Sequence, residues 1–116
     1  MITLMSWGHK YGTPPANFKF DVSYFKNPWR DKETRNSDKK TIISFMERQK
    51  GVNKFVLNLV QMLLDLNEQF KEEEIKVAIC CSAGEYRSPA IVELIGKELS
   101  KRKVKYVINH SKESLL

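Results

Sequence analysis

The stretch that decides the fold is IKVAICCSAGEYRSPAIVELIGKEL, residues 75–99. Its first six residues form an apolar run broken by one lysine, which is typical of a strand in the middle of a parallel sheet. After Pro89, apolar residues return at helical spacing, and those on one face are Ile91, Leu94, Ile95 and Leu99. The short polar segment between these two patterns therefore predicts a tight loop that joins a buried strand to the first turn of a helix.

This loop has the residues of an anion site. The first N–H groups of a helix have no intrahelical acceptor, and the helix dipole favours negative charge beside them. Gly84 permits tight curvature, and Pro89 suits the first helical turn. Arg87 can hold two phosphate oxygens, and Ser88 can donate one more hydrogen bond. We therefore predict that an oxyanion binds the loop formed by Cys81, Ser82, Ala83, Gly84, Glu85, Tyr86, Arg87 and Ser88.

The same loop leaves a catalytic alternative open. The Cys-x5-Arg spacing of Cys81 and Arg87 is similar to the phosphatase signature, and RSPA resembles the continuation in low-molecular-weight tyrosine phosphatases. In that chemistry Cys81 attacks phosphorus, Arg87 binds the equatorial oxygens and Ser88 helps the thiolate to leave. Asp21, at the end of an earlier strand, is the first candidate for the general acid, and Asp31 is the second.

Two observations weigh against a phosphatase. Those enzymes carry the loop at the very N-terminus, whereas here it follows 80 residues. Glu85, inside the loop, is an unfavourable charge beside a phosphate dianion. The opposing interpretation of Cys81 is a small buried residue that closes its strand. We therefore expect no catalysis and keep the phosphatase as the alternative.

Strand and helix patterns alternate along the rest of the chain. Alternation or apolar runs predict strands over 2–6, 18–22 and 104–108, and helical spacing predicts helices over 39–49 and 52–72. Ser37 and Asp38 are candidate N-caps for the first of these helices. We predict an α/β fold, a small layered domain over residues 1–116 with a mostly parallel sheet of about four strands.

Composition limits the classes of protein that fit. Hydrophobic residues make up 41% and charged residues 29%, which is ordinary for a globular domain. No apolar run approaches the roughly 20 residues that span a bilayer, and no signal-peptide pattern opens the chain. We therefore expect a cytoplasmic protein without a membrane partner. Cys80 and Cys81 are adjacent, so we expect neither a disulfide framework nor a zinc site, and we expect no metal and no cofactor.

Charge is unevenly distributed along the chain. Residues 1–54 carry 11 Lys or Arg against 5 Asp or Glu, residues 55–96 carry 3 against 7, and residues 97–116 carry 6 against 2. The densest basic run is KELSKRKVK, 97–105, whose cations are candidate contacts to an RNA backbone: Lys97, Lys101, Arg102, Lys103 and Lys105. The simpler interpretation is a solvated helix end whose charge complements the dipole.

Aromatic side chains lie between cations in the first 30 residues. Trp7, Tyr11 and Trp29 fall in predicted loops, where aromatics can stack on bases. His9 and His110 are expected near the same end of the sheet, because strand ends and the loops that follow them gather on one side. A solvated loop residue is the simpler interpretation of His9.

Four segments resemble one family along nearly the whole chain, the C-terminal domain of the RNase adapter protein RapZ. SWGHKYG (6–12) is similar to that family's S-F-G-F-K-Y-G, and FDVSYFKNP (20–28) to its F-D-V-R-F-L-x-N-P. CSAGEYRS (81–88) resembles C-T-G-G-x-H-R-S, and VINHSKE (107–113) falls where the family has V-x-H-R-D. The four segments occur in the family's order and at similar spacing.

The resemblance implies a non-catalytic α/β domain that binds small RNAs and a phosphorylated amino sugar and forms homo-oligomers. It adds ligand-binding candidates outside the 81–88 loop, by matched position: Gly8, Lys10, Tyr11, Gly12, Asp21, Asn27 and His110. His9 joins these ligand-binding candidates through its expected place at the same end of the sheet. The family's N-terminal nucleotide-binding domain has no counterpart in the sequence, which implies a stand-alone module. Tyr86 replaces the family's loop histidine, Glu85 makes the loop less positive, and Ser23 replaces the arginine after D-V.

Taken together, these patterns predict a non-catalytic domain that binds a phosphate-bearing ligand. The ligand is expected to be RNA or a small nucleotide or sugar phosphate. A cysteine-dependent phosphatase is the first alternative. A module that sequesters or modulates a partner protein is the second.

Overall fold

Four parallel strands form one sheet in the computed structural model, which describes all residues from 1 to 116. The strands are β1 (Ile2–Gly8), β2 (Phe18–Asp21), β3 (Ile75–Cys81) and β4 (Tyr106–Asn109). Their spatial order is β2-β3-β1-β4, and all three neighbouring pairs run parallel. The predicted α/β class and the strand–loop–helix unit after β3 are both confirmed, and the sheet is parallel throughout.

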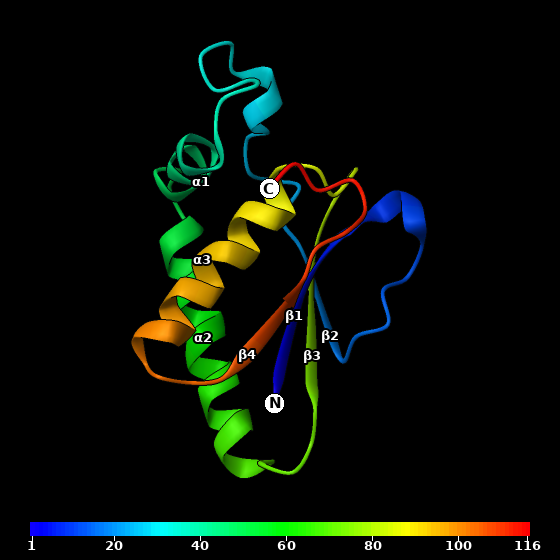
Figure 1. The fold of residues 1–116 in the computed structure, drawn as a ribbon, viewed down its shortest axis with the longest axis vertical. Helices are drawn as coiled ribbons and strands as arrows, with labels where there is room; N and C mark the ends of the chain where they lie inside the picture. Colours follow the sequence, from blue (N-terminus) through cyan, green and yellow to red (C-terminus); the bar gives the residue numbers. More distant parts are fainter.

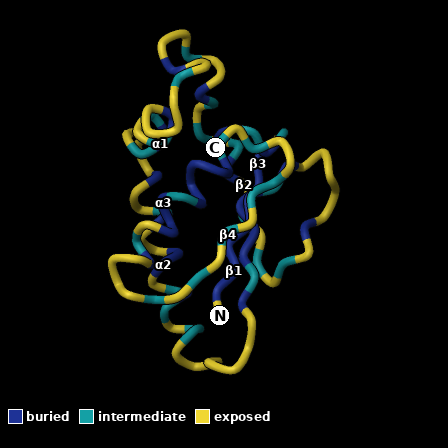
Figure 2. The backbone as a smooth tube through the Cα atoms, viewed as in Figure 1, coloured by how far each residue is buried: buried dark blue, intermediate teal, exposed yellow.

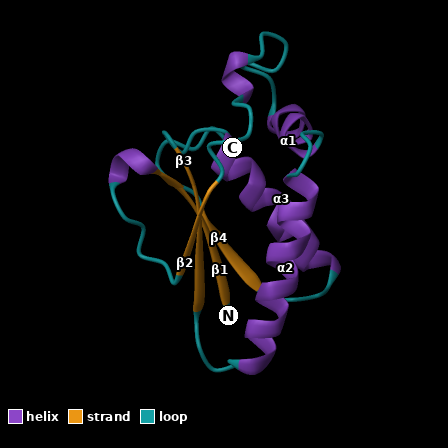
Figure 3. Cartoon of the chain, turned by 180° about the vertical axis from the view of Figure 1, so that it is seen from behind, coloured by secondary structure: helices purple, strands orange, loops and turns teal.

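All three helices cover one face of this sheet (Figures 1 and 3). They are α1 (Lys39–Glu47), α2 (Val52–Gln69) and α3 (Arg87–Lys101). The β2-to-β3 and β3-to-β4 connections carry these helices and move the chain across the sheet in the same direction, whereas β1-to-β2 moves it back. Because parallel crossovers are right-handed, the returning connection passes over the opposite face. It holds only the short 3-10 helix η1 (His9–Tyr11) and a loop.

The core lies between the sheet and the helices (Figure 2). Side chains alternate along a strand, so in β3 Val77, Ile79 and Cys81 join the main core, whereas Ala78 and Cys80 face the other side. On that side a small apolar cluster of Met5, Ala78 and Cys80 is covered by Trp7 and Ala16. Both faces of β3 are therefore buried, as its apolar run predicts.

Element boundaries differ from expectation by a few residues. Asp38 is the N-cap of α1, and its carboxylate accepts a hydrogen bond from the Thr41 N–H at 2.8 Å. β4 begins at Tyr106 rather than at residue 104, because Lys103 (φ 58°) turns the chain after α3 and the Val104 N–H still bonds the Leu99 carbonyl. None of the helices is both long and apolar enough to cross a membrane.

One further 3-10 helix, η2 (Pro28–Arg30), lies in the long segment between β2 and α1. The Asn27 carboxamide caps it, since Oδ1 accepts a hydrogen bond from the Trp29 N–H at 3.1 Å. The segment rises beyond the carboxyl edge of the sheet and over the beginning of α3 (Figure 1).

Candidate functional site

The carboxyl ends of the four strands bring the predicted ligand-binding residues to one edge of the sheet. β1 ends at Gly8, β2 at Asp21, β3 at Cys81 and β4 at Asn109. From β1 the chain leaves toward one side of the sheet, and from β3 it leaves toward the other. The crevice between two such strands is where ligands bind in open parallel sheets. The 81–88 loop lies at this point.

Backbone contacts hold the 81–88 loop against the end of β1. A Cβ placed on Gly8 would lie 2.7 Å from the backbone C and O atoms of Ala83. A Cβ placed on Gly84 would lie 2.7 Å from the Ser111 Oγ and 3.0 Å from the Gly8 N. Gly84 also has a φ of 74°, in the left-handed region. Only glycine at both positions allows these two backbones to approach so closely.

Six successive N–H groups at this loop have no acceptor. The backbone N–H groups from Ser82 to Arg87 donate no hydrogen bond within the chain. The next N–H, that of Ser88, donates to the Cys81 Sγ at 3.4 Å. These donors lead into the first turn of α3, whose dipole adds positive potential. The arrangement can hold an oxyanion through its backbone alone.

The guanidinium of Arg87 joins the loop to the segment that follows β2. One nitrogen, Nη1, donates to the Ser23 carbonyl at 2.7 Å and to the Phe25 carbonyl at 3.3 Å. The other, Nη2, lies 3.4 Å from the Ser82 Oγ. Arg87 therefore keeps its positive charge beside the loop while two backbone carbonyls fix its direction.

The two cysteines face opposite sides of the sheet. Cys81 is buried on the helix side, where its thiol donates to the Ser88 Oγ at 3.3 Å, and the Ser88 hydroxyl lies 3.4 Å from the Trp7 carbonyl. Asp21 is opposite Cys80 in the β2–β3 register and shares a cavity with it. The structure thus brings Cys81 and Ser88 together, whereas the Arg87 guanidinium contacts Ser82, and Asp21 lies beside the other cysteine.

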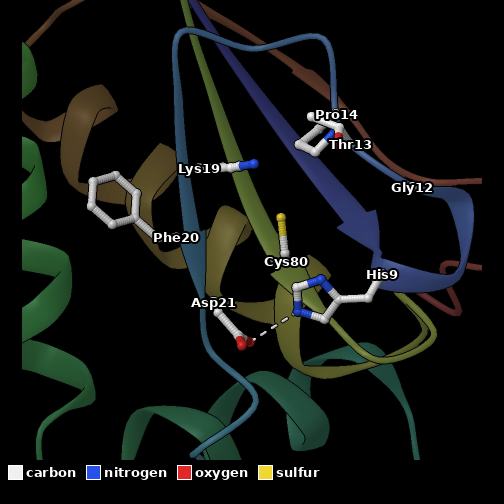
Figure 4. A pocket seen from close by; sticks show the side chains of 8 residues that line it. All are labelled: His9, Gly12, Thr13, Pro14, Lys19, Phe20, Asp21 and Cys80. Atoms are coloured by element: carbon white, nitrogen blue, oxygen red, sulfur yellow. Dashed lines mark ion pairs between the residues drawn. The ribbon is translucent and has the colours of Figure 1, made fainter.

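That cavity, about 410 Å³, opens beside the end of β2 and the η1 loop. His9 and Asp21 point toward each other there, with the His9 Nε2 3.2 Å from the Asp21 Oδ1 (Figure 4). Lys19 and Cys80 line the same space. Hydrogen bonds from Ser23 and the nearby His9, which outweigh partial burial, lower the pKa of Asp21 to about 2. The cavity wall therefore carries a carboxylate that stays ionised at any physiological pH.

Burial acts on the thiol in this cavity in the opposite way. Desolvation, and then the Asp21 charge, raise the pKa of Cys80. Cys80 is consequently a neutral thiol at neutral pH. No cluster of three or more His, Cys, Asp or Glu side chains in the chain could hold a metal ion.

His110 lies at the same edge but faces α3. Its Nδ1 is 3.0 Å from the Ser6 Oγ, and its Nε2 is 3.0 Å from the Glu93 Oε2. Glu93 also pairs with the Lys39 Nζ at 2.8 Å. Although burial favours the neutral acid, the Lys39 and His110 hydrogen bonds lower the pKa of Glu93. Both nitrogens of the His110 ring therefore have protein partners.

The η1 residues and the aromatic candidates have structural contacts of their own. The Trp7 Nε1 donates to the Gly12 carbonyl at 2.8 Å, and its ring meets Tyr11 edge-on with centroids 5.9 Å apart. The Lys10 Nζ is 3.9 Å from the Glu113 carboxylate. Trp29 stacks on Tyr86 at 6.2 Å, and the Arg35 guanidinium lies 4.9 Å from its ring centroid. These rings hold loops around the site together.

The basic run lies at the other end of the molecule. Lys103 and Lys105 line a hollow with Met1 and Lys71, at the amino edge of the sheet. Lys101 and Arg102 share one carboxylate, that of Glu98, at 3.1 and 2.8 Å. Lys97 is exposed further back along α3, in the α1–α3 groove. The structure therefore separates the predicted RNA contacts from the 81–88 loop.

Several residues of the edge were not among the predicted site residues. Lys19 and Cys80 line the cavity, and strand alternation alone would have placed them on the same face as Asp21. Ser6, Glu93 and Ser111 surround His110 and the loop. Because their contacts join segments about 20 to 100 residues apart, no local pattern signals them.

The chain is similar to a known protein family and to several bacterial proteins. A family model described as the RapZ C-terminal domain matches residues 1–114. A nucleotide-binding protein of Pediococcus pentosaceus is 32% identical over 116 residues, 95% of this chain and 38% of its own length. Similar proteins of Actinobacillus pleuropneumoniae and Lawsonia intracellularis are 33% and 32% identical, covering 94% of this chain and 40% and 36% of theirs. The chain thus spans about two fifths of the relatives it matches.

The family match extends over both halves of the edge, from SWGHKYG at the end of β1 to the histidine after β4. It confirms the resemblance that the four segments indicated. By this match the chain belongs to the RapZ C-terminal domain family.

Proposed function

We propose that this domain binds a phosphate-bearing ligand of the nucleotide or RNA type without catalysing its cleavage. The observation that carries the proposal is the run of six N–H groups, Ser82 to Arg87, without an acceptor. A phosphate group would accept hydrogen bonds from these donors, with the Arg87 charge beside it. The whole relatives, of which this chain spans about two fifths, are named nucleotide-binding protein, which agrees with this ligand class.

The cavity next to the loop suits the rest of such a ligand. It begins at Cys80, immediately before the loop, and at His9, immediately after Gly8. The Asp21 carboxylate can accept hydrogen bonds from hydroxyl, amino or base groups. The His9 ring can donate hydrogen bonds to such groups or accept them. Lys19 adds one positive charge at the rim. A small phosphorylated molecule would thus place its phosphate on the loop and its polar body in the cavity.

A phosphatase is less well supported by the same geometry. The Cys81 thiol is buried and donates to the Ser88 hydroxyl, and Asp21 lies beside Cys80 rather than Cys81. We therefore expect no hydrolysis of p-nitrophenyl phosphate above the rate of a Cys81→Ser variant. Turnover that disappears in Cys81→Ser would overturn the non-catalytic assignment.

Calorimetric titration with inorganic phosphate, adenosine 5′-monophosphate and adenosine tests the binding proposal. We expect the two phosphate-bearing probes to bind and adenosine to bind at least ten-fold more weakly. Glu85→Gln removes a like charge from the loop and should tighten phosphate binding about three-fold. Glu72→Gln, an equal charge change in the segment after α2, is the control and should leave affinity unchanged.

Two outcomes contradict the proposal. One is a wild-type protein that binds neither phosphate-bearing probe at low salt. The other is equal tightening by Glu85→Gln and Glu72→Gln, which would mean that net charge rather than the loop attracts the anion.

A further inference from the structure

The C-terminal segment, residues 111–116, lies along the outside of the 81–88 loop. The Ser111 hydroxyl donates to the Gly84 carbonyl at 2.9 Å, and the Leu115 N–H donates to the Glu85 carbonyl at 3.0 Å. Two successive carbonyls of the loop are therefore held by one segment that is about 30 residues away in the sequence. Figure 1 shows this segment, in red, beside the beginning of α3.

These two bonds determine the direction of two free donors. In a trans peptide the carbonyl and the following N–H lie in one plane and point in opposite directions, and the chain has no cis peptide. Holding the Gly84 carbonyl turns the Glu85 N–H away from the C-terminal segment. Holding the Glu85 carbonyl does the same for the Tyr86 N–H. Both N–H groups belong to the run without acceptors.

Ser111 is itself held from the core side. Its N–H donates to the Ser6 Oγ at 3.0 Å. The Glu93 carboxylate can only accept, so the His110 Nε2–H donates to it, and in the neutral ring the Nδ1 then accepts from the Ser6 hydroxyl. Ser6 is 1% exposed, so the chain of bonds begins inside the protein.

Other contacts keep the segment in place at its far end. Leu116 packs against the main core, and Glu113 lies 3.9 Å from the Lys10 Nζ on the η1 side. The Ser114 N–H closes a turn onto the Ser111 carbonyl at 3.1 Å. The segment therefore crosses the 81–88 loop between Ser111, which is bonded to Ser6, and Leu116, which packs against the core.

We propose that the C-terminal segment is a positioning element for the phosphate site, with Ser111 as the positioning residue that orients the Glu85 and Tyr86 N–H groups. This inference rests on the proposed function for the ligand, but the orientation itself is a property of the free protein. Preorganised donors bind an anion without first being ordered, so loss of the orientation weakens binding.

The test uses Ser111→Ala, which removes the hydroxyl donor, and Ser111→Thr, which keeps it. Ser114→Ala is the matched control, because the Ser114 Oγ accepts only from the Leu116 N–H and does not contact the loop. We expect Ser111→Ala to bind inorganic phosphate about five-fold more weakly in a nuclear magnetic resonance titration. Ser111→Thr should restore affinity, and Ser114→Ala should match the wild type.

A second readout needs no ligand. In the free protein the amide signals of Glu85 and Tyr86 should shift or broaden in Ser111→Ala and return in Ser111→Thr. Unchanged signals for both amides in Ser111→Ala overturn the positioning role, whether or not phosphate binds. A wild-type protein that binds no phosphate instead overturns the proposed function, and the amide signals still decide the orientation.

Discussion

The two edges of the sheet offer an anion different kinds of hydrogen-bond donor. At the carboxyl edge the donors are backbone N–H groups, held by glycine contacts and by the carbonyl bonds of Ser111 and Leu115. At the amino edge the charges are on long exposed side chains, and two of them share Glu98. Fixed donors select for the shape of an anion, whereas mobile cations select only for its charge. The carboxyl edge should therefore be sensitive to geometry and the amino edge to salt.

The strongest test of the geometry at the carboxyl edge is Gly84→Ala. The change places a Cβ 2.7 Å from the Ser111 Oγ and keeps a φ of 74° that costs a residue with a Cβ about 1–2 kcal/mol. Strain and overpacking together should lower the free energy of unfolding by about 3 kcal/mol. Urea denaturation measures this loss, and phosphate binding should disappear with it.

Substitutions at two other glycines separate the cost of the positive φ from the cost of the close contact. Gly12 has a φ of 85° but nothing within 4 Å of its added Cβ, so Gly12→Ala should cost only about 1 kcal/mol. Gly8 has a φ of −103°, so Gly8→Ala tests the contact with Ala83 alone. Equal losses for Gly84→Ala and Gly12→Ala would mean that the close contact at the loop contributes nothing.

Arg87→Ala is expected to have the next largest effect on stability. Its guanidinium donates to the Ser23 and Phe25 carbonyls, and hydrogen bonds to a charged group contribute about 1.5–3 kcal/mol. We expect the free energy of unfolding to fall by about 2 kcal/mol in urea denaturation. Arg35→Ala, which removes an exposed bond to the Trp29 carbonyl and a cation–π contact with the Trp29 ring, should cost about 1 kcal/mol. If Arg87→Ala lost less free energy of unfolding than Arg35→Ala, Arg87 would not be what holds the 81–88 loop to the segment after β2.

Much of the fold could be predicted from the sequence because it depends on local patterns. The apolar run of β3 and the helical face of α3 follow from residues that are neighbours in the chain. The boundary of β4 was wrong by two residues, because Lys103 adopts a positive φ that a lysine rarely takes. Such a conformation is decided by packing after α3 rather than by the residue itself.

The candidate site was less predictable, because its contacts connect distant segments. The loop 81–88 is contiguous and could be recognised, and strand alternation could have separated Cys80 from Cys81. The hydrogen bonds of His110 to Ser6 and Glu93 join positions 104 and 17 residues apart. The side chain of Asn27 caps a 3-10 helix that no periodicity indicates.

Glu93→Gln tests the hydrogen bonds that run from Glu93 through His110 to Ser6, by the pH dependence of the free energy of unfolding. The folded-state pKa of Glu93 lies below its usual 4.5, so its ionised form stabilises the fold at pH values above 4.5. That stabilisation is lost as the pH falls through the lower, folded-state value. We expect Glu93→Gln to cost about 1 kcal/mol at pH 7, and this cost should shrink as the pH falls below 4.5 toward 3.

Denaturation with urea at both pH values measures the difference. Asp65→Asn, on the exposed side of α2, is the control and should show no pH-dependent loss. A deficit of Glu93→Gln that persists unchanged at pH 3 would show that the carboxylate charge is not its cause.

The smallest effect on stability, and the sharpest contrast with the carboxyl edge, is expected from the basic run. RNA affinity should fall with salt by about 0.7 in log–log slope for each phosphate contacted on a single strand. Lys103 and Lys105 form no ion pair, whereas Lys101 and Arg102 already share Glu98. The double variant Lys103→Gln/Lys105→Gln should therefore flatten the slope by about 1.4, and Lys101→Gln/Arg102→Gln by less, although both remove two charges.

A salt titration with a single-stranded RNA measures both slopes, and phosphate affinity at the distant loop should stay unchanged. Equal flattening would mean that Glu98 does not hold its partners back from RNA, and full slopes in both variants would leave the basic run as a solvated helix end.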